Sequence, residues 1–222
     1  FNQELNKWRF STTQDVKMDG MFQKTDFNKD ISLWNTQRVI KMNYMFDANP
    51  YFNQYIRSWD MSSNQGVTNM FRSAPALTNG TYGNGVAGFA ETPNVAEYFI
   101  GRFKPVDNAS LQNAVNLWVS DNATALSTYG EINTWDTSLI TNMYRLFYRK
   151  GGNAGFNSDI SNWNTSNVTS MKDMFREMQF NHPLNDWDVS KVTDFDGMFK
   201  DNREFNQELN KWRFSTTQDV KM

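Results

Sequence analysis

FNSDISNWNTSNVTSMKDMF, residues 156–175, contains the pattern that organises this chain. Phe-Asn is followed by an aliphatic residue three positions after the Asn, by Trp three positions later, and then by an aliphatic residue, Met and Met-Phe at fixed offsets. The same slots are filled in order at residues 27–46 and, with Phe195 in one Met slot, at residues 180–199. Agreement across all of these slots indicates an internal repeat.

Three further copies of the repeat deviate from this pattern. Residues 52–71 have Asn64 in the second aliphatic slot, residues 132–147 lack the leading Phe-Asn, and residues 1–22 contain two additional residues. Residues 205–222 begin the pattern once more. We call each copy a coil. Within each run of coils, the Trp slots are 24 to 28 positions apart: Trp8, Trp34 and Trp59, then Trp135, Trp163, Trp187 and Trp212.

The offsets within a coil predict its local structure. Val168, Met171, Met174 and Phe175 lie at i, i+3, i+6 and i+7, which is typical of one face of a two-turn helix, and Ser170–Asp173 resembles its capping box. The Trp-Asn-Thr-Ser segment before it favours extended chain and then a turn. One coil buries too few side chains to fold alone, so neighbouring coils must cover one another. The sequence therefore predicts an α/β repeat, a solenoid of coils that each contain a short strand and a short helix.

The Phe-Asn, Ile, Trp-Asp/Asn, Thr/Val-Ser, Val-Thr, Met and Met-Phe slots resemble the BspA-like bacterial surface repeats of about 25 residues, which also occur in mycoplasma lipoproteins. The resemblance covers about two thirds of the chain. It implies a leucine-rich-repeat-like solenoid on a cell surface or in a secreted protein, with a role in adhesion or scaffolding. It implies no catalytic residues.

A longer period is superimposed on the coils. Residues 1–18, FNQELNKWRFSTTQDVKM, recur without a change as residues 205–222, 204 positions later. Diverged repeats do not keep identical surface residues, so we expect one cycle of a tandem array plus 18 residues of the next. On this expectation Asp-Gly-Met-Phe follows Met222 as it follows Met18. Joining the ends would then place six uninterrupted coils after residues 76–131.

The coils fall into two groups, three at residues 1–75 and the others at residues 132–222. Residues 76–131 separate them, and we expect a loop followed by a helical cap or linker there. The loop is the Gly/Asn-rich stretch at 79–88. A helical cap would cover the open end of a stack, where apolar coil faces would otherwise meet water.

Two helices are predicted in the second part of this insert. The second would run from Ser120 to Tyr129 and end at Gly130. The first would begin at Asp107 or Asn108 and bury apolar residues at i, i+3, i+4 and i+7, namely Leu111, Ala114, Val115 and Trp118.

Composition excludes several classes of function. With 22 basic and 24 acidic residues, the net charge of −2 gives no basic footprint for nucleic acid or for an anionic membrane. No stretch approaches the length of an apolar membrane span. Because Cys is absent, disulfide scaffolds, Cys-ligated zinc and thiol catalysis are excluded.

Some motifs are typical of ligand sites but have a structural explanation. Gly83–Gly88 matches GxGxxG, yet no apolar strand precedes it, Pro93 lies where the helix should run, and we expect a plain loop. His182 is the only histidine, which argues against a catalytic triad or His-ligated zinc.

Two sets of residues have the chemistry of metal ligands. The Met slots would suit a soft metal, but Met beside Phe at this spacing indicates packing. Two pairs of carboxylates, Asp186 with Asp188 and Asp194 with Asp196, could bind calcium. Roles in turns and helix caps explain these residues better. We therefore expect no metal and no cofactor. N-x-S/T sequons make five residues candidates for glycosylation: Asn79, Asn108, Asn122, Asn164 and Asn167.

The expected function is structural, not enzymatic. We expect tandem solenoid domains to form an extracellular filament or surface fibre, in which each unit's partner is the next copy, with lateral copies as a further partner. The alternative is a surface adhesin that recognises a host protein or glycan through its exposed sheet face or the 79–88 loop. The stacking would depend on core aromatic residues: Trp8, Trp34, Trp59, Trp135, Trp163, Trp187, Trp212, Phe46, Phe147, Phe175 and Phe199.

Overall fold

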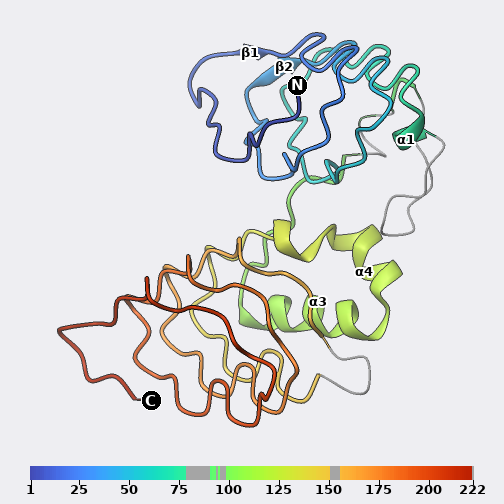
Figure 1. Cartoon of the computed structure of the whole chain (residues 1–222). Helices are drawn as coiled ribbons and strands as arrows, with labels where there is room; N and C mark the ends of the chain where they lie inside the picture. The colour runs from blue at the N-terminus through green and yellow to red at the C-terminus, as the bar shows by residue number, and fades with distance from the viewer. Residues whose placement is uncertain (79–90, 94, 96–98, 151–155, 222) are drawn as a thin grey trace. The chain divides into compact units, whose positions relative to one another are not determined.

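The computed structural model describes residues 1–78, 91–93, 95, 99–150 and 156–221. The chain divides into two units, Phe1–Arg102 (unit 1) and Phe103–Met222 (unit 2). Most of each unit consists of loops that lie side by side (Figure 1). The elements in the described residues are short: β1 (Val16–Lys17), β2 (Val39–Lys41), α1 (Pro75–Thr78), α3 (Asn108–Ser120), α4 (Asn122–Tyr129) and the 3-10 turn η1 (Ile132–Thr134).

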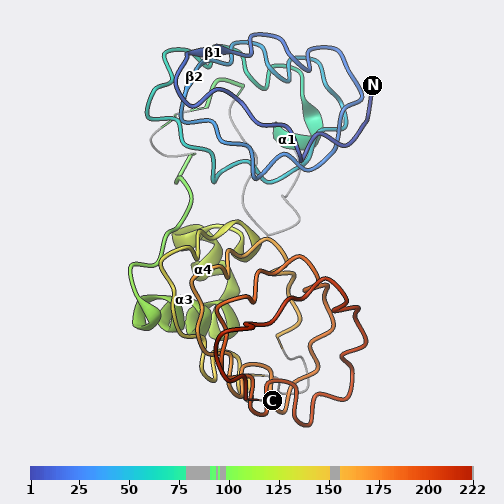
Figure 2. The same ribbon diagram turned by 90° about the vertical axis from the view of Figure 1, so that its left-hand side faces the viewer.

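In unit 1 the coils at 1–22, 27–46 and 52–71 lie in succession (Figure 2). The strands β1 and β2 pair in parallel, with Val16 opposite Val39 and Lys17 opposite Lys41. Backbone hydrogen bonds continue this pairing beyond the strands. The Phe22 N–H donates to the Met45 carbonyl at 2.8 Å. Equivalent positions of neighbouring coils are therefore aligned.

Unit 2 repeats this alignment over four coils. Isolated parallel bridges join Asn142 to Ser170, Ser170 to Asp194, and Asp194 to Lys221. Asn142, Ser170 and Asp194 each lie five positions before the Phe that ends their coil, and Lys221 corresponds to Lys17, which lies five positions before Phe22. Adjacent coils of unit 2 are thus linked through their backbones in one register.

The two-turn helix expected in each coil does not form at residues 39–46, 168–175 or 192–199. These residues make consecutive turns instead. Backbone N–H groups alternate between a local carbonyl and the next coil: Met45 donates to Met42 at 3.3 Å, and Phe46 donates to Met70 at 2.9 Å. The i, i+3 spacing of apolar residues also suits successive turns, so periodicity could not distinguish them from a helix.

Left-handed backbone conformations interrupt any helix at two fixed places in the coil. Two residues before the Phe slot, φ is positive at Gly20, Tyr44, Asn69, Arg145, Asp173 and Gly197. Two residues after it, φ is positive at Lys24, Ala48, Ser73, Arg149, Glu177 and Asp201. Such residues redirect the backbone so that alternate N–H groups reach the neighbouring coil. Non-Gly residues are costly there, and the hydrogen bonds between coils offset that cost.

The two predicted helices form, although the second begins at Asn122 and not at Ser120, because α3 extends to Ser120. Asp107 is the N-cap of α3: its Oδ1 accepts from the Ser110 N–H at 2.7 Å, and the Ser110 hydroxyl accepts from the Asp107 N–H at 3.0 Å. This capping box satisfies backbone donors that a helix start leaves unpaired. Gly130, with φ of 72°, ends α4. The face of α3 that is buried is the predicted one: Leu111, Ala114, Val115 and Trp118.

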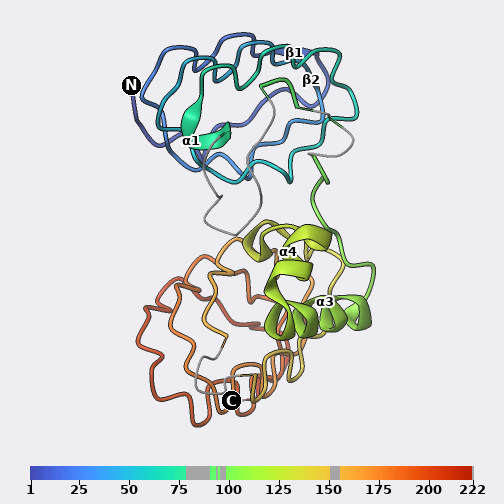
Figure 3. The same ribbon diagram turned by 90° about the vertical axis from the view of Figure 1, so that its right-hand side faces the viewer.

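Within unit 2, α3 and α4 lie at the end of the coil stack away from residue 221 (Figure 3). The Trp118 ring meets Trp135 edge-on at 5.9 Å, and Gln112 Nε2 donates to the Leu146 carbonyl at 3.2 Å. These helices therefore pack on the coil at 132–147. No helix in the described part of the chain is long and apolar enough to cross a membrane.

Candidate functional site

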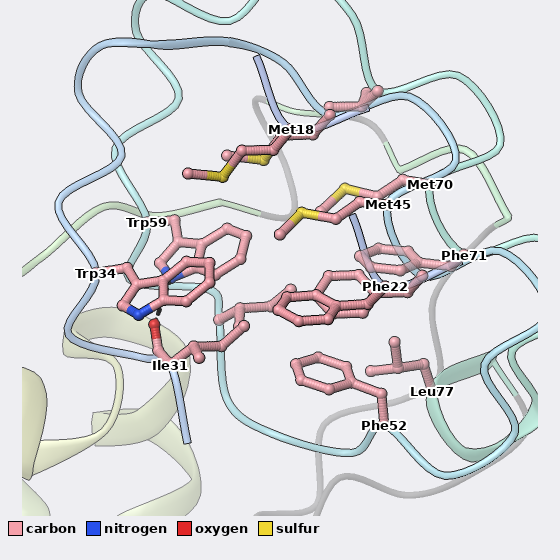
Figure 4. Packing of buried hydrophobic residues seen from close by; sticks show 14 of the residues in the cluster. Met18, Phe22, Ile31, Trp34, Met45, Phe52, Trp59, Met70, Phe71 and Leu77 are labelled. Atoms are coloured by element: carbon pink, nitrogen blue, oxygen red, sulfur yellow. Dashed lines mark hydrogen bonds between the residues drawn. The ribbon is translucent and has the colours of Figure 1, made fainter. Parts of the chain in front are cut away.

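The interior of each unit is a ladder of stacked aromatic rings. The ring centroids of Trp34 and Trp59 are 6.2 Å apart and their planes differ by 4° (Figure 4). Phe46 stacks on Phe22 at 5.6 Å. In unit 2, Trp135 stacks on Trp163 at 6.1 Å. Each ring thus packs against its equivalents in the neighbouring coils, and burial of these large side chains supplies most of the driving force for stacking.

The Trp slot also forms a polar link between coils. In five coils the indole Nε1 donates to the backbone carbonyl of the first aliphatic slot in the preceding coil, whereas Trp135 Nε1 donates to the Gly130 carbonyl at 3.1 Å. This hydrogen bond explains why the slot contains Trp rather than Phe, because a buried carbonyl needs a donor. Five pairs share it: Trp34 with Leu5 at 3.0 Å, Trp59 with Ile31 at 3.0 Å, Trp163 with Ile132 at 2.7 Å, Trp187 with Ile160 at 3.3 Å and Trp212 with Leu184 at 2.9 Å.

The Asn after the leading Phe forms a second ladder, which the sequence reasoning missed. The Asn53 N–H donates to Asn28 Oδ1 at 2.9 Å, and the Asn206 N–H donates to Asn181 Oδ1 at 2.9 Å. The signal was present in the sequence, because Asn follows Phe in coil after coil. The side-chain oxygen of Asn in this slot accepts a hydrogen bond from the backbone N–H of the equivalent Asn in the next coil.

Asp47 is a buried carboxylate that joins three coils of unit 1. Arg72 binds both its oxygens, at 2.9 and 2.7 Å, and Gln23 Nε2 donates to Oδ2 at 2.7 Å. Hydrogen bonding to Arg72 lowers the pKa of Asp47 below its usual value, against the opposing effect of burial. This arrangement favours the charged form, so the site acts as an ionic clamp.

Asp173 plays a similar part in unit 2. Burial opposes its ionisation, but hydrogen bonds from Arg145 and Arg176 outweigh that effect and lower the pKa of Asp173. Arg145 Nε lies 3.1 Å from Asp173 Oδ2, and Arg176 Nη1 lies 3.2 Å from Oδ1. Each unit therefore contains a buried acid held by arginine.

A cluster of tyrosine and arginine lies on the surface of unit 2. The guanidinium of Arg145 is 5.0 Å from the Tyr144 ring and 4.9 Å from the Tyr148 ring. Arg149 is 5.0 Å and Arg176 is 5.7 Å from Tyr148. Arg149 also pairs with Glu177. We call these five residues, Tyr144, Arg145, Tyr148, Arg149 and Arg176, the Tyr–Arg cluster.

An apolar groove opens on the last coil of unit 2. Its volume is about 390 Å³. Phe214 is 42% exposed beside it, whereas Trp212 is buried at its base. We call it the 195–214 groove, after its apolar lining of Phe195, Met198, Phe199, Leu209, Trp212 and Phe214.

Comparison with protein families shows a match over coils of both units. The family described as "Mycoplasma protein of unknown function, DUF285" matches residues 1–92 and 110–222. The chain belongs to the DUF285 family. The match covers coils of both units and most of α3 and α4. Comparisons of this DUF285 chain with curated proteins and with solved structures return no match.

The DUF285 chain buries most of the aromatic residues predicted for its core. Trp8 is the main exception, because it is 47% exposed in the first coil of unit 1, where only one side of the coil is covered. Phe199 is partly exposed where it lines the 195–214 groove. The others are buried: Trp34, Trp59, Trp135, Trp163, Trp187, Trp212, Phe46, Phe147 and Phe175.

The sequons of this DUF285 chain lie at exposed positions wherever the structure describes them. Asn79 lies outside the described residues, and Asn108, Asn122, Asn164 and Asn167 are exposed. The Asn167 amide donates to the Ser138 carbonyl at 2.9 Å, and Asn164 Oδ1 accepts from the Ser166 N–H. Asn122 begins α4.

The carboxylates weighed for calcium bind protein groups instead. Asp186 pairs with Lys211 at 2.7 Å, and Asp196 pairs with Lys172 at 2.6 Å. Asp188 and Asp194 accept backbone N–H groups two residues later, at 3.0 and 3.1 Å. Among the residues that the structure describes, no group of three His, Cys, Asp or Glu could hold a metal ion.

The remaining candidates are structural or lie outside the described residues. The Met slots are buried in hydrocarbon, as at Met45 and Met174. The His182 ring nitrogen Nε2 lies 2.7 Å from the Asn157 carbonyl oxygen. Gly83–Gly88, and with it the 79–88 loop, falls outside the described residues.

Proposed function

We propose that this chain is a structural component of an extracellular filament or surface fibre, built from tandem leucine-rich-repeat-like solenoid domains of the BspA-like type. The observation that carries the proposal is the shared register of the coils. In unit 2, parallel bridges join equivalent slots of four successive coils, from Asn142 to Lys221. A stack of this kind has a direction along which further coils can be added.

The mechanism of such a protein is mechanical. Each coil contacts its neighbour through stacked rings, backbone hydrogen bonds, the Trp-to-carbonyl bonds and the Asn ladder. Buried ionic clamps at Asp47 and Asp173 add links between coils. A stack held by so many parallel contacts resists bending and shear.

Localisation at the cell surface or outside the cell forms part of the same proposal. The slots that resemble BspA-like surface repeats support it. Partners of the chain are then further copies of itself along the fibre.

Electron microscopy of the native material tests the proposal. We expect long threads of uniform width, with a repeat along the thread that corresponds to one 204-residue period. Antibodies against unit 2 should decorate the threads at that spacing. Isolated short particles on the cell surface, without threads, would contradict a filament.

The second candidate, an adhesin, is favoured by the Tyr–Arg cluster. Tyr144 is 44% exposed, and flat aromatic rings beside guanidinium groups suit sugar rings and acidic glycans. A glycan array with the 222-residue chain would test it. The double variant Tyr144→Ala/Tyr148→Ala should lose the signal, whereas Tyr51→Ala, exposed in unit 1, should keep it. An array without signal would remove this candidate.

A further inference from the structure

A hollow opens on unit 2 where the start of α3 meets the coil at 132–147. Its volume is about 240 Å³. This is below the roughly 300–1,000 Å³ of sites for drug-sized ligands, so the hollow suits a ligand the size of one sugar ring. We call it the 108–146 hollow, after its lining of Asn108, Ala109, Gln112, Asn142, Met143, Tyr144 and Leu146.

Two asparagine amides supply hydrogen-bond donors at the hollow. Asn108 Oδ1 accepts from the backbone N–H groups of Thr141 and Asn142, at 3.4 and 3.2 Å. Asn142 Oδ1 accepts from the Tyr144 N–H at 2.8 Å. Both side-chain oxygens are thus bound by the backbone. Among the residues that the structure describes, neither Nδ2 donates to a protein group, so both amides keep their N–H groups for a ligand.

The rest of the lining supplies an acceptor and an apolar surface. Gln112 Nε2 donates to the Leu146 carbonyl at 3.2 Å, which leaves Oε1 of the same amide as the acceptor. Met143 and Leu146 are buried, and Tyr144 is 44% exposed. The hydroxyl groups of a sugar both donate and accept hydrogen bonds, and its C–H groups pack on aromatic rings. The lining of the hollow matches both properties.

Positive charge is in excess beside the hollow. The Arg145 guanidinium lies over the Tyr144 ring, 5.0 Å from its centroid. The three guanidinium groups of the Tyr–Arg cluster face two carboxylates, Asp173 and Glu177. Arg145 reaches Asp173 through Nε, and its side chain is 44% exposed, so its terminal nitrogens are accessible to an anion. Asp107 uses its carboxylate to cap α3.

We propose that the 108–146 hollow binds one sugar residue that carries a carboxylate, a hexuronic acid at the end of a glycan chain. The sugar ring packs on Tyr144, and its carboxylate pairs with Arg145. Its hydroxyl groups bond to the amides of Asn108, Gln112 and Asn142. The inference rests on the second candidate function, the adhesin, for which it names the sugar and the site, and it is independent of the filament.

A nuclear magnetic resonance titration of the 222-residue chain tests the proposal. The probes are methyl glucuronide and methyl galacturonide. Methyl glucoside is the neutral control, because it has a hydroxymethyl group in place of the carboxylate of the glucuronide. The chain is produced without N-glycosylation, since Asn108 belongs to a sequon. We expect a uronide to bind about tenfold more tightly than the glucoside, because its carboxylate forms a charge-assisted hydrogen bond.

Two substitutions remove the donors but keep the turns. Asn108→Asp and Asn142→Asp each retain an oxygen for the backbone N–H and replace the Nδ2 group by a negatively charged oxygen. Each should weaken uronide binding by about tenfold or more. Asn164→Asp is the matched control, because Asn164 Oδ1 also accepts an N–H two residues later, at 3.0 Å, and lies outside the lining of the hollow. It should bind as the wild type does, and circular dichroism shows that each variant is folded.

Substitution of Arg145 tests the contact with the carboxylate separately. Arg145→Gln removes the charge, so it should reduce the affinity for the uronide to that for the glucoside. Arg145→Lys keeps the charge and should therefore retain a preference for the uronide.

Three results would overturn the proposal. They are the absence of shifts with either uronide, equal affinities for glucuronide and glucoside, and uronide binding by Asn142→Asp that equals that of Asn164→Asp. A glycan-array signal that neither Asn108→Asp nor Asn142→Asp weakens would leave an adhesin that binds elsewhere. An array without signal removes the adhesin itself, so the two failures are distinguishable.

Discussion

The indole in a buried Trp slot packs against neighbouring rings, and in five coils it also donates a hydrogen bond to the preceding coil. At Trp163, which is 3% exposed, both contributions are present, because the ring stacks on Trp135 and Nε1 lies 2.7 Å from the Ile132 carbonyl. We expect Trp163→Ala to lower the free energy of unfolding of unit 2 by about 3–5 kcal/mol. Urea unfolding followed by far-ultraviolet circular dichroism measures the change.

Two variants control this prediction. Trp163→Phe keeps a ring but leaves the Ile132 carbonyl without its donor, so it should cost about 1–3 kcal/mol. Trp8→Ala, at a 47% exposed residue of the same slot, should cost far less. Equal stability losses at Trp8 and Trp163 would refute the role assigned to burial.

The clamp at Asp47 predicts a dependence of stability on pH. Its folded-state pKa lies below its unfolded value, so its contribution is fully present above the unfolded pKa of about 3.9 and is lost as the pH falls through the folded pKa. We expect Asp47→Asn to destabilise unit 1 at pH 7 and the difference from wild type to shrink toward pH 3.

Urea midpoints measured across that range test the Asp47 prediction. Asp26→Asn, at an exposed residue of the same unit, should leave the midpoint at pH 7 close to that of the wild type. A difference between Asp47→Asn and the wild type that stayed constant from pH 7 to pH 3 would mean that the charge of Asp47 does not stabilise the fold.

Gly197 and Gly101 both have a positive φ, but only at Gly197 would an added Cβ meet a neighbouring atom. The φ of Gly197 is +65°, and an added Cβ would lie 2.7 Å from Asp173 Oδ1. Gly101 has a similar φ of +71° but no atom within 4 Å of that position. We expect Gly101→Ala to cost about 1 kcal/mol from strain alone, and Gly197→Ala to cost clearly more. Thermal unfolding of the two variants makes the comparison, and equal shifts would exclude the clash with Asp173.

At the scale of the element, backbone hydrogen bonding decides between helix and turn. An isolated segment such as 168–175 could satisfy its N–H groups only within itself, which favours a helix. In the stack, the Phe175 N–H donates to the Met198 carbonyl at 2.8 Å, and the Asp173 N–H donates to Asp196 at 2.9 Å. Acceptors in the neighbouring coil therefore replace the i→i−4 bonds.

The helix α3 keeps its form because its ends are capped locally. Removing the capping box with Asp107→Ala should lower the stability of unit 2 by about 1 kcal/mol. Asp186→Ala is the matched control, since its carboxylate forms only an exposed pair with Lys211, which contributes little. Urea unfolding compares the two, and an equally small effect of both would show that the cap of α3 does not limit stability.

At the scale of the whole molecule, the two units should unfold as separate cooperative transitions, because each has its own buried ladder of rings. We expect Trp59→Ala to lower the midpoint of one transition and Trp163→Ala to lower the other. Differential scanning calorimetry with both variants checks this. A single transition shifted equally by either substitution would mean that the units unfold together.

The sequence by itself determined the slots, the register and the two helices. Aromatic residues at a nearly constant spacing could be buried together only if successive coils aligned. Asp107 and Gly130 set the helix ends through contacts with residues a few positions away. The repeat spacing and the helix caps depend on residues close together in the chain, so they can be recognised in a single sequence.

Only the tertiary structure decided the turns within each coil and the buried ionic clamps, because both depend on which groups a neighbouring coil supplies. The turns at 168–175 exist because another coil provides acceptors, and Asp47 is a clamp because Gln23 and Arg72 arrive from coils on either side. Residues 1–18 and 205–222 make the same point most directly: one sequence buries Leu5 in one place and Trp212 in the other, according to the side from which it is covered.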